Sequence, residues 1–98
     1  MQIKSNLPHH KPKEIALNVD TPDIDFSAAR EIAREAVQEL GTDAMLLSWH
    51  NKKTGEFYPK TECGRDARPP WVVFAESRGA NLIVDINGGD FRFYFLLL

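Results

Sequence analysis

Two apolar runs on either side of a glycine pair constrain the fold most. Residues 82–86 read Leu-Ile-Val-Asp-Ile, residues 91–95 read Phe-Arg-Phe-Tyr-Phe, and Gly88-Gly89 lies between them. β-branched and aromatic residues favour strands, and paired glycines favour the tight turn of a hairpin. The sequence therefore predicts an antiparallel hairpin at this end of the chain.

The glycine turn also predicts which residues lie opposite each other. The expected pairs are Ile86 with Phe91, Val84 with Phe93, and Leu82 with Phe95. Side chains alternate between the two faces of a strand, so these apolar residues share one face. On the other face, Asp85 lies opposite Arg92, as an expected cross-strand charge pair. A further strand is expected over 69–75, joined to the strand over 82–86 by a turn at Arg78-Gly79. The register that this turn sets would place the apolar residues of both strands on the same face.

The rest of the chain predicts one helix and three further strands. A strand is expected over 14–20, a helix from Asp25 or Ser27 to Leu40, a strand over 44–50 and an edge strand after Gly55 that includes Pro59. The turn at 52–55 is expected to pair Asn51 with Glu56, His50 with Phe57, and Trp49 with Tyr58. Residues 1–13 are expected to form a loose lead-in and residues 14–98 a single domain. The predicted fold is two-layer α+β: a mainly antiparallel sheet of five or six strands with one helix on one face, in the order βαβββββ.

Length and charge narrow the function classes. The 98 residues suffice for one domain, and 12 basic against 14 acidic residues give a net charge of -2. Because no basic block is present, nucleic acid is not expected as a partner. No apolar run approaches the roughly 18 residues that cross a membrane, and no signal-peptide core is visible, so a cytoplasmic location is expected. The single cysteine, Cys63, has no partner for an internal disulfide.

One helix covers one face of such a sheet, and the opposite face is predicted to be apolar as well. The expected outward residues are Val72, Phe74, Ile83, Tyr94 and Leu96. An apolar patch of this kind marks an interaction site. Because homodimers are the commonest oligomers, a second copy of the chain is the expected partner. Residues 1–20 folding over the patch, or a different partner, are the alternatives.

Few residues suggest chemistry. The candidates are His50, Cys63, Glu76 and Arg78, and the expected register separates His50 from Cys63 by roughly 20 Å. A Cys-His nucleophile pair requires hydrogen-bond contact. No known catalytic, phosphate-binding or metal-binding motif is present, so no catalytic, cofactor-binding or metal-binding residue is assigned and any cofactor is unknown.

Several segments resemble a known family. They are residues 45–57, residues 59–64, Pro70-Trp71, and residues 75–79, which read Ala-Glu-Ser-Arg-Gly. Across 26–95 the chain resembles a small microbial family that is labelled a domain of unknown function and is known mainly from structural genomics. The resemblance implies a compact α+β domain and transfers no activity.

Two hypotheses on function follow. The first is a non-enzymatic binding or interaction module that acts through its apolar sheet face as a homodimer. The alternative is an enzyme or a metal or thiol site that uses Cys63 with His50, or with Glu76 and Asp85.

Overall fold

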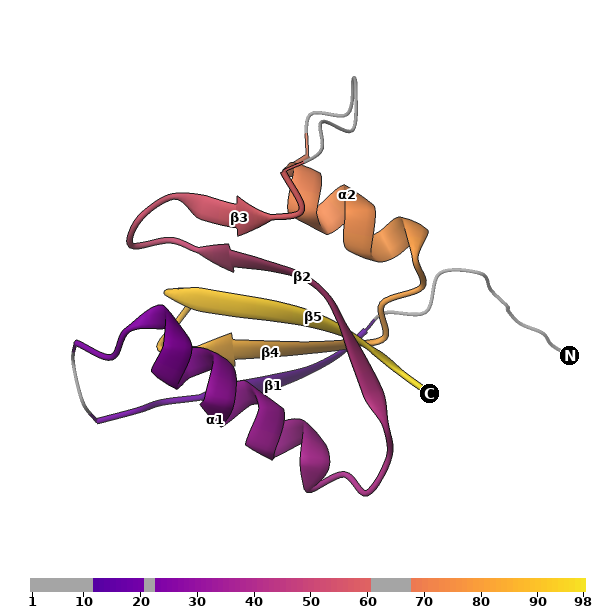
Figure 1. Ribbon diagram of the computed structural model, residues 1–98, viewed down its shortest axis with the longest axis horizontal. Helices are drawn as coiled ribbons and strands as arrows, with labels where there is room; N and C mark the ends of the chain where they lie inside the picture. The colour runs from indigo at the N-terminus through magenta and orange to yellow at the C-terminus, as the bar shows by residue number, and fades with distance from the viewer. Residues whose placement is uncertain (1–11, 21–22, 61–67) are drawn as a thin grey trace, which may run out of the picture.

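The computed structural model describes residues 12–20, 23–60 and 68–98, which form one five-stranded sheet and two helices (Figure 1). The elements in chain order are β1 (Lys13–Leu17), α1 (Phe26–Gln38), β2 (Ala44–Asn51), β3 (Glu56–Tyr58), α2 (Pro70–Ser77), β4 (Leu82–Ile86) and β5 (Phe91–Leu97). Across the sheet the strands lie in the order β1-β4-β5-β2-β3. Among the strands of the described ranges, β1 and β4 are the one pair that runs parallel. The predicted α+β class and mainly antiparallel sheet are therefore confirmed.

The β4–β5 hairpin has the predicted register. Ile86 lies opposite Phe91, Val84 opposite Phe93, and Leu82 opposite Phe95. The turn between the strands has positive φ angles of 57° at Asn87, 66° at Gly88 and 100° at Gly89. Glycine adopts such angles without steric cost, which is why the glycine pair specifies the turn.

Side chains reinforce this turn from two sides. The Asp85 carboxylate accepts a hydrogen bond from the backbone N–H of Gly89 at 2.7 Å. The Asn87 side-chain oxygen accepts another from the backbone N–H of Val19, also at 2.7 Å. The turn therefore holds both its own hairpin and the segment that follows β1.

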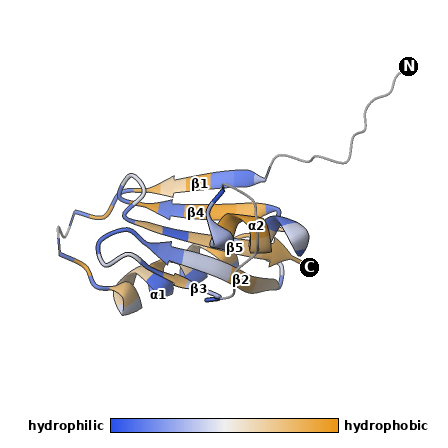
Figure 2. Cartoon of the chain, turned by 90° about the horizontal axis from the view of Figure 1, so that it is seen from above, coloured by the Kyte–Doolittle hydropathy of each residue, from blue (hydrophilic) through white to orange (hydrophobic). Residues whose placement is uncertain are grey.

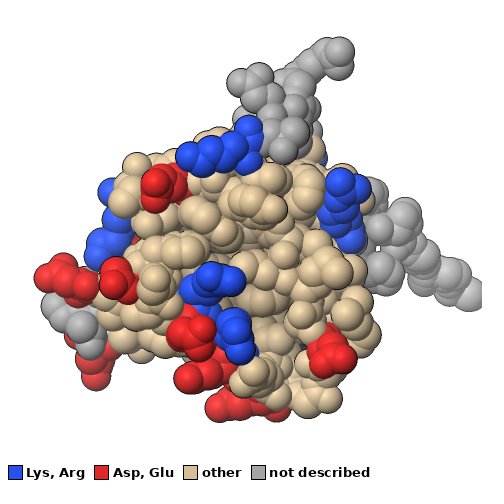
Figure 3. All heavy atoms as spheres, in the orientation of Figure 1, with Lys and Arg blue, Asp and Glu red and all other residues tan. Residues whose placement is uncertain are grey.

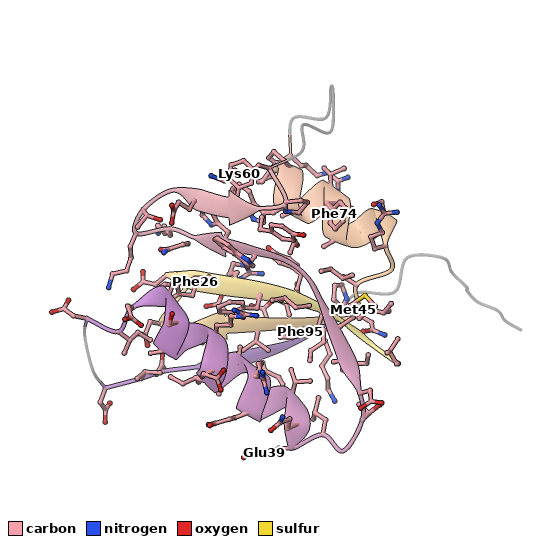
Figure 4. All side chains as sticks on the ribbon, viewed as in Figure 1. Phe26, Glu39, Met45, Lys60, Phe74 and Phe95 are labelled. Carbon is pink, nitrogen blue, oxygen red and sulfur yellow. The ribbon has the colours of Figure 1, made fainter. Side chains whose placement is uncertain are left out.

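Helix α1 and the sheet enclose the larger core. Asp25 caps the helix by accepting a hydrogen bond from the N–H of Ala28 at 2.8 Å, as one of the two predicted starts requires. The buried residues Ala29, Ala33 and Val37 recur every four positions and pack on the six apolar residues paired in the β4–β5 hairpin. Small residues on this stripe let the helix approach the sheet closely. Phe26, labelled in Figure 4, adds its ring at 4.2 Å from that of Trp49.

The β2–β3 hairpin also has the predicted register, with Asn51 opposite Glu56, His50 opposite Phe57 and Trp49 opposite Tyr58. β3 lies at the edge of the sheet, as the proline at position 59 predicts. The other edge is β1, which begins at Lys13 and ends at Leu17, three residues earlier than expected.

The strand predicted over 69–75 is wrong, because Pro70–Ser77 is helix α2. The element order is therefore βαββαββ, and the sheet has a helix on each face rather than one helix in all. Ile83 packs with α2 residue Ala75, whereas its neighbour Val84 packs with α1, which shows that the two helices lie on opposite faces. Figure 2 shows the hydrophobic residues along much of α2.

Local chemistry explains the helix. Proline at the first helical position costs no hydrogen bond and already has a helical φ. At the other end, Gly79 has a φ of 84°, its N–H donates to Glu76 O at 3.1 Å, and Ala80 N–H donates to Ala75 O at 3.0 Å. These two bonds form a Schellman motif. Gly79, which we expected in a hairpin turn, thus ends a helix.

Candidate functional site

The α2 side of the sheet brings together the residues that the sequence proposed for an interface. Ile83 and Tyr94 are buried beneath α2, where they pack with Ala75. They therefore cannot contact a partner, and this part of the expected interface is corrected: a helix of the same chain covers them. Val72, Phe74 and Leu96 are half-buried and remain partly accessible.

Helix α2 has a second apolar side that packs on neither core. Trp71, Val72 and Ala80 pack against the buried residues under the helix, whereas Val73 and Phe74 belong to neither core cluster. Figure 4 labels Phe74 on the helix. We call Val73 and Phe74 the outer side of α2.

Charged residues border this outer side. The Arg78 guanidinium lies 4.8 Å from the centre of the Phe74 ring. Glu76 forms an ion pair of 2.6 Å with Arg68, and both side chains are about half exposed. The two predicted candidates Glu76 and Arg78 thus contribute to a rim of mixed charge.

A second apolar pair lies on the same face of the sheet, at the end of β5. Met45 on β2 pairs with Leu96 on β5, and Met45 is 51% exposed. Both strand positions alternate with residues that α1 covers, so both point to the α2 side. Figure 4 labels Met45 on β2.

His50 lies at the start of α2, against an aromatic cluster. Its ring stacks on the Trp71 indole at 4.0 Å with an interplanar angle of 7°, and the Phe57 ring lies 5.0 Å from Trp71. The Ser48 hydroxyl donates to the Trp71 carbonyl at 2.9 Å and anchors this end of the helix to β2. Burial lowers the pKa of His50, and the positive charges of Lys52 and Arg92 lower it further. The imidazole is therefore neutral at pH 7.

A network of charged residues lies beside His50 in the sheet and is centred on Arg92. Arg92 lies opposite both His50 and Asp85, so the predicted charge pair is confirmed. Its guanidinium donates to Asp85, to Glu14 at 3.3 Å and to the Tyr94 hydroxyl at 3.2 Å. Burial alone would lower the pKa of Arg92, but Tyr94, Glu14 and Asp85 together raise it. With its donors engaged, Arg92 joins three strands and is a structural residue.

The remaining chemical candidate, Cys63, lies outside the described residues. Across 12–20, 23–60 and 68–98, no group of three His, Cys, Asp or Glu residues could hold a metal ion. Within the same ranges, no helix is long and apolar enough to cross a membrane. The described residues on the α2 side offer apolar contact area and a mixed-charge rim.

Comparison with known proteins places the chain in a family. A family model described as a domain of unknown function, DUF5619, matches residues 12–95. The chain belongs to the DUF5619 family. This DUF5619 domain is 37% identical over 82 residues to an uncharacterized protein of Archaeoglobus fulgidus, a match that covers 84% of each chain. The resemblance found in the sequence is thereby confirmed.

A solved structure shows the same fold as this DUF5619 domain. The crystal structure of a protein from Archaeoglobus fulgidus, described as novel, superposes with a TM-score of 0.76 at 33% identity. The match covers 89% of the DUF5619 chain and 95% of the other chain.

Sequence reasoning missed Val73 because its exposure depends on α2. It missed Met45 because the β-bulge between Leu46 and Ser48 breaks the alternation of β2 and places Met45 and Trp49 on opposite faces. A strand over 69–75 would alternate Val73 to the α1 side and bury it. The signal that could have identified the helix was present: a proline pair before an apolar segment and a glycine just after it, the usual asymmetry of helix ends.

Proposed function

We propose that this protein is a non-enzymatic interaction module that forms a homodimer through the outer side of α2. The observation that carries the proposal is that α2 is apolar on two sides while only one side packs on the sheet. A helix that is apolar all round is typical of a buried position. A partner over Val73 and Phe74 would bury the second side.

A second copy of the chain suits this surface better than a partner of a single charge. The rim carries both signs, Glu76 with Arg68 and Arg78 beside Phe74. Around a two-fold axis each copy presents the same acidic and basic groups to the other, so Glu76 of one copy can approach Arg78 of the other. The exposed Met45 and the half-buried Leu96, which lie on the same face, can extend the apolar contact.

Two further hypotheses from the sequence stand beside this proposal. The cytoplasmic location is one, and it accords with a chain that carries a single cysteine. The thiol-based alternative is the other, and it depends on Cys63.

Sedimentation equilibrium of the purified chain between about 1 and 200 μM tests the dimer. We expect a species of twice 11.1 kDa at the upper end of this range. In Val73→Lys the added charge would be buried against its copy in a dimer, and burying an unpaired charge is costly. Its dimer dissociation constant should rise at least tenfold, which corresponds to a loss of about 1.4 kcal/mol or more of dimerisation free energy.

The matched control is Tyr58→Lys. Tyr58 is 52% exposed and stacks on Trp49, on the opposite side of the sheet from α2. This variant should dimerise as the natural chain does. A natural chain that stays monomeric throughout the range, or equal dissociation of the two variants, would refute the proposal.

A further inference from the structure

A cavity of about 300 Å³ lies on the other side of the sheet, between α1 and the strands β2 and β5. Its lining residues are Arg30, Arg34, Val37, Gln38, Thr42, Asp43, Ala44, Leu46 and Phe95. None of these residues belongs to the proposed dimer surface. The cavity therefore raises a separate question of what it could bind.

The floor of the cavity is apolar and buried. Val37 is 4% exposed and Phe95 is 4% exposed, and both belong to the main core. Leu46 and Ala44 pack against the same core from β2. The Thr42 hydroxyl donates to the Leu98 carbonyl at 3.0 Å, and the Leu98 N–H donates to Asp43 O at 2.9 Å, so the turn at this end is tied to β5.

Two arginines line the helix side of the cavity. Arg30 and Arg34 are one turn apart, beside the buried stripe of α1, and residues four apart lie on the same face of a helix. Arg34 approaches Glu31 only at 4.0 Å, with both side chains more than half exposed. Among the described residues none forms a hydrogen bond or ion pair with the Arg30 side chain. Both guanidinium groups are thus available to a ligand.

We propose that this cavity binds a small monoanionic carboxylate with an apolar body. Arginine presents paired N–H donors that match the two oxygens of a carboxylate. The apolar body would lie on Val37, Leu46 and Phe95. Asp43 also lines the cavity, and its negative charge opposes a doubly charged group more strongly than a singly charged one. This favours a carboxylate over a phosphate.

The volume supports a small ligand. Ligand cavities usually measure about 300 to 1,000 Å³, so this one is at the lower limit. An aromatic or branched acid of about ten non-hydrogen atoms fits that limit, and binding should be weak, near millimolar, at the efficiency usual for such ligands.

Titration of the ¹⁵N-labelled chain with phenylacetate, followed by amide NMR shifts, tests the proposal. We expect saturable shifts at Val37, Leu46 and Phe95. Phenylacetamide, which has the same shape without the charge, should bind at least tenfold more weakly, and phenyl phosphate should bind more weakly than phenylacetate. Arg34→Gln should weaken phenylacetate binding at least fivefold, as should Arg30→Gln.

The control is Lys52→Gln, which also removes one positive charge but lies in the β2–β3 turn, away from the cavity. It should bind phenylacetate as the natural chain does. Absence of saturable shifts, equal binding of the amide, or tighter binding of phenyl phosphate would overturn the proposal. The amide spectrum reports the fold of each variant, so a variant that fails to fold would be recognised. In that case the binding of the three ligands to the natural chain would decide whether the proposal holds.

Discussion

At the scale of single residues, His50 combines an aromatic stack with a titratable group. Its ring lies flat on Trp71, beside the positive charges of Lys52 and Arg92. The pairing of His50 with Phe57 was predictable from the hairpin turn, because a turn of fixed length sets the register. The contact with Trp71 was not, because it depends on where α2 lies.

The pKa of His50 predicts how stability depends on pH. Burial, then Lys52 and Arg92, lower this pKa below its usual 6.5, so the unfolded chain takes up the proton first as the pH falls. Its contribution to stability is therefore fully present above about pH 6.5 and is lost as the pH falls through the lower pKa of the folded state. Urea unfolding between pH 5 and 8 measures this dependence.

His50→Phe keeps an aromatic ring against Trp71 and removes the titration. As the pH falls, the natural chain should therefore lose more unfolding free energy than this variant. A difference that is constant with pH would contradict the lowered pKa. So would an increase, at acidic pH, in the stability of the natural chain relative to the variant.

At the scale of elements, the two hairpins were predictable and α2 was not. The β4–β5 register followed from Gly88-Gly89 and from the alternation of Val84 and Ile86, which are local features. The segment over 70–77 contains Trp71, Val72, Val73 and Phe74, residues that favour a strand. Its helical state is set by proline at one end, the Schellman motif at the other, and packing on Ile83 and Tyr94. Tertiary packing thus overrode intrinsic preference.

The end of α2 gives a prediction at this scale. Gly79 has a φ of 84° and open space around the position of an added Cβ, so a side chain there would meet strain without a clash. Gly79→Ala should lower the unfolding free energy by about 1 kcal/mol, because non-glycine residues resist this conformation. Gly79→Asn should lower the unfolding free energy by less, since asparagine tolerates left-handed angles. Urea unfolding of the three proteins compares them, and an alanine variant as stable as the natural chain would show that the motif does not fix the helix end.

At the scale of the whole molecule, the sheet separates two surfaces of different composition. The α1 side holds the main core and a cavity bordered by arginines, and Figure 3 shows basic and acidic side chains interspersed on that face. The α2 side has a smaller core and an outer apolar side with a mixed-charge rim. Composition and periodicity predicted the α+β class and an apolar second face. They could not predict that a helix of the same chain covers part of this face, because the segment that forms α2 was expected to be a strand.

An isotope-filtered NOE experiment tests the proposed dimer most directly. An equal mixture of ¹³C,¹⁵N-labelled and unlabelled chains, at a concentration where sedimentation shows the dimer, reports only contacts between copies. The proposed dimer predicts intermolecular NOEs to the methyl groups of Val73 and the ring of Phe74. Intermolecular NOEs confined to the α1 side or to the free edge of β1, or none at all, would contradict it.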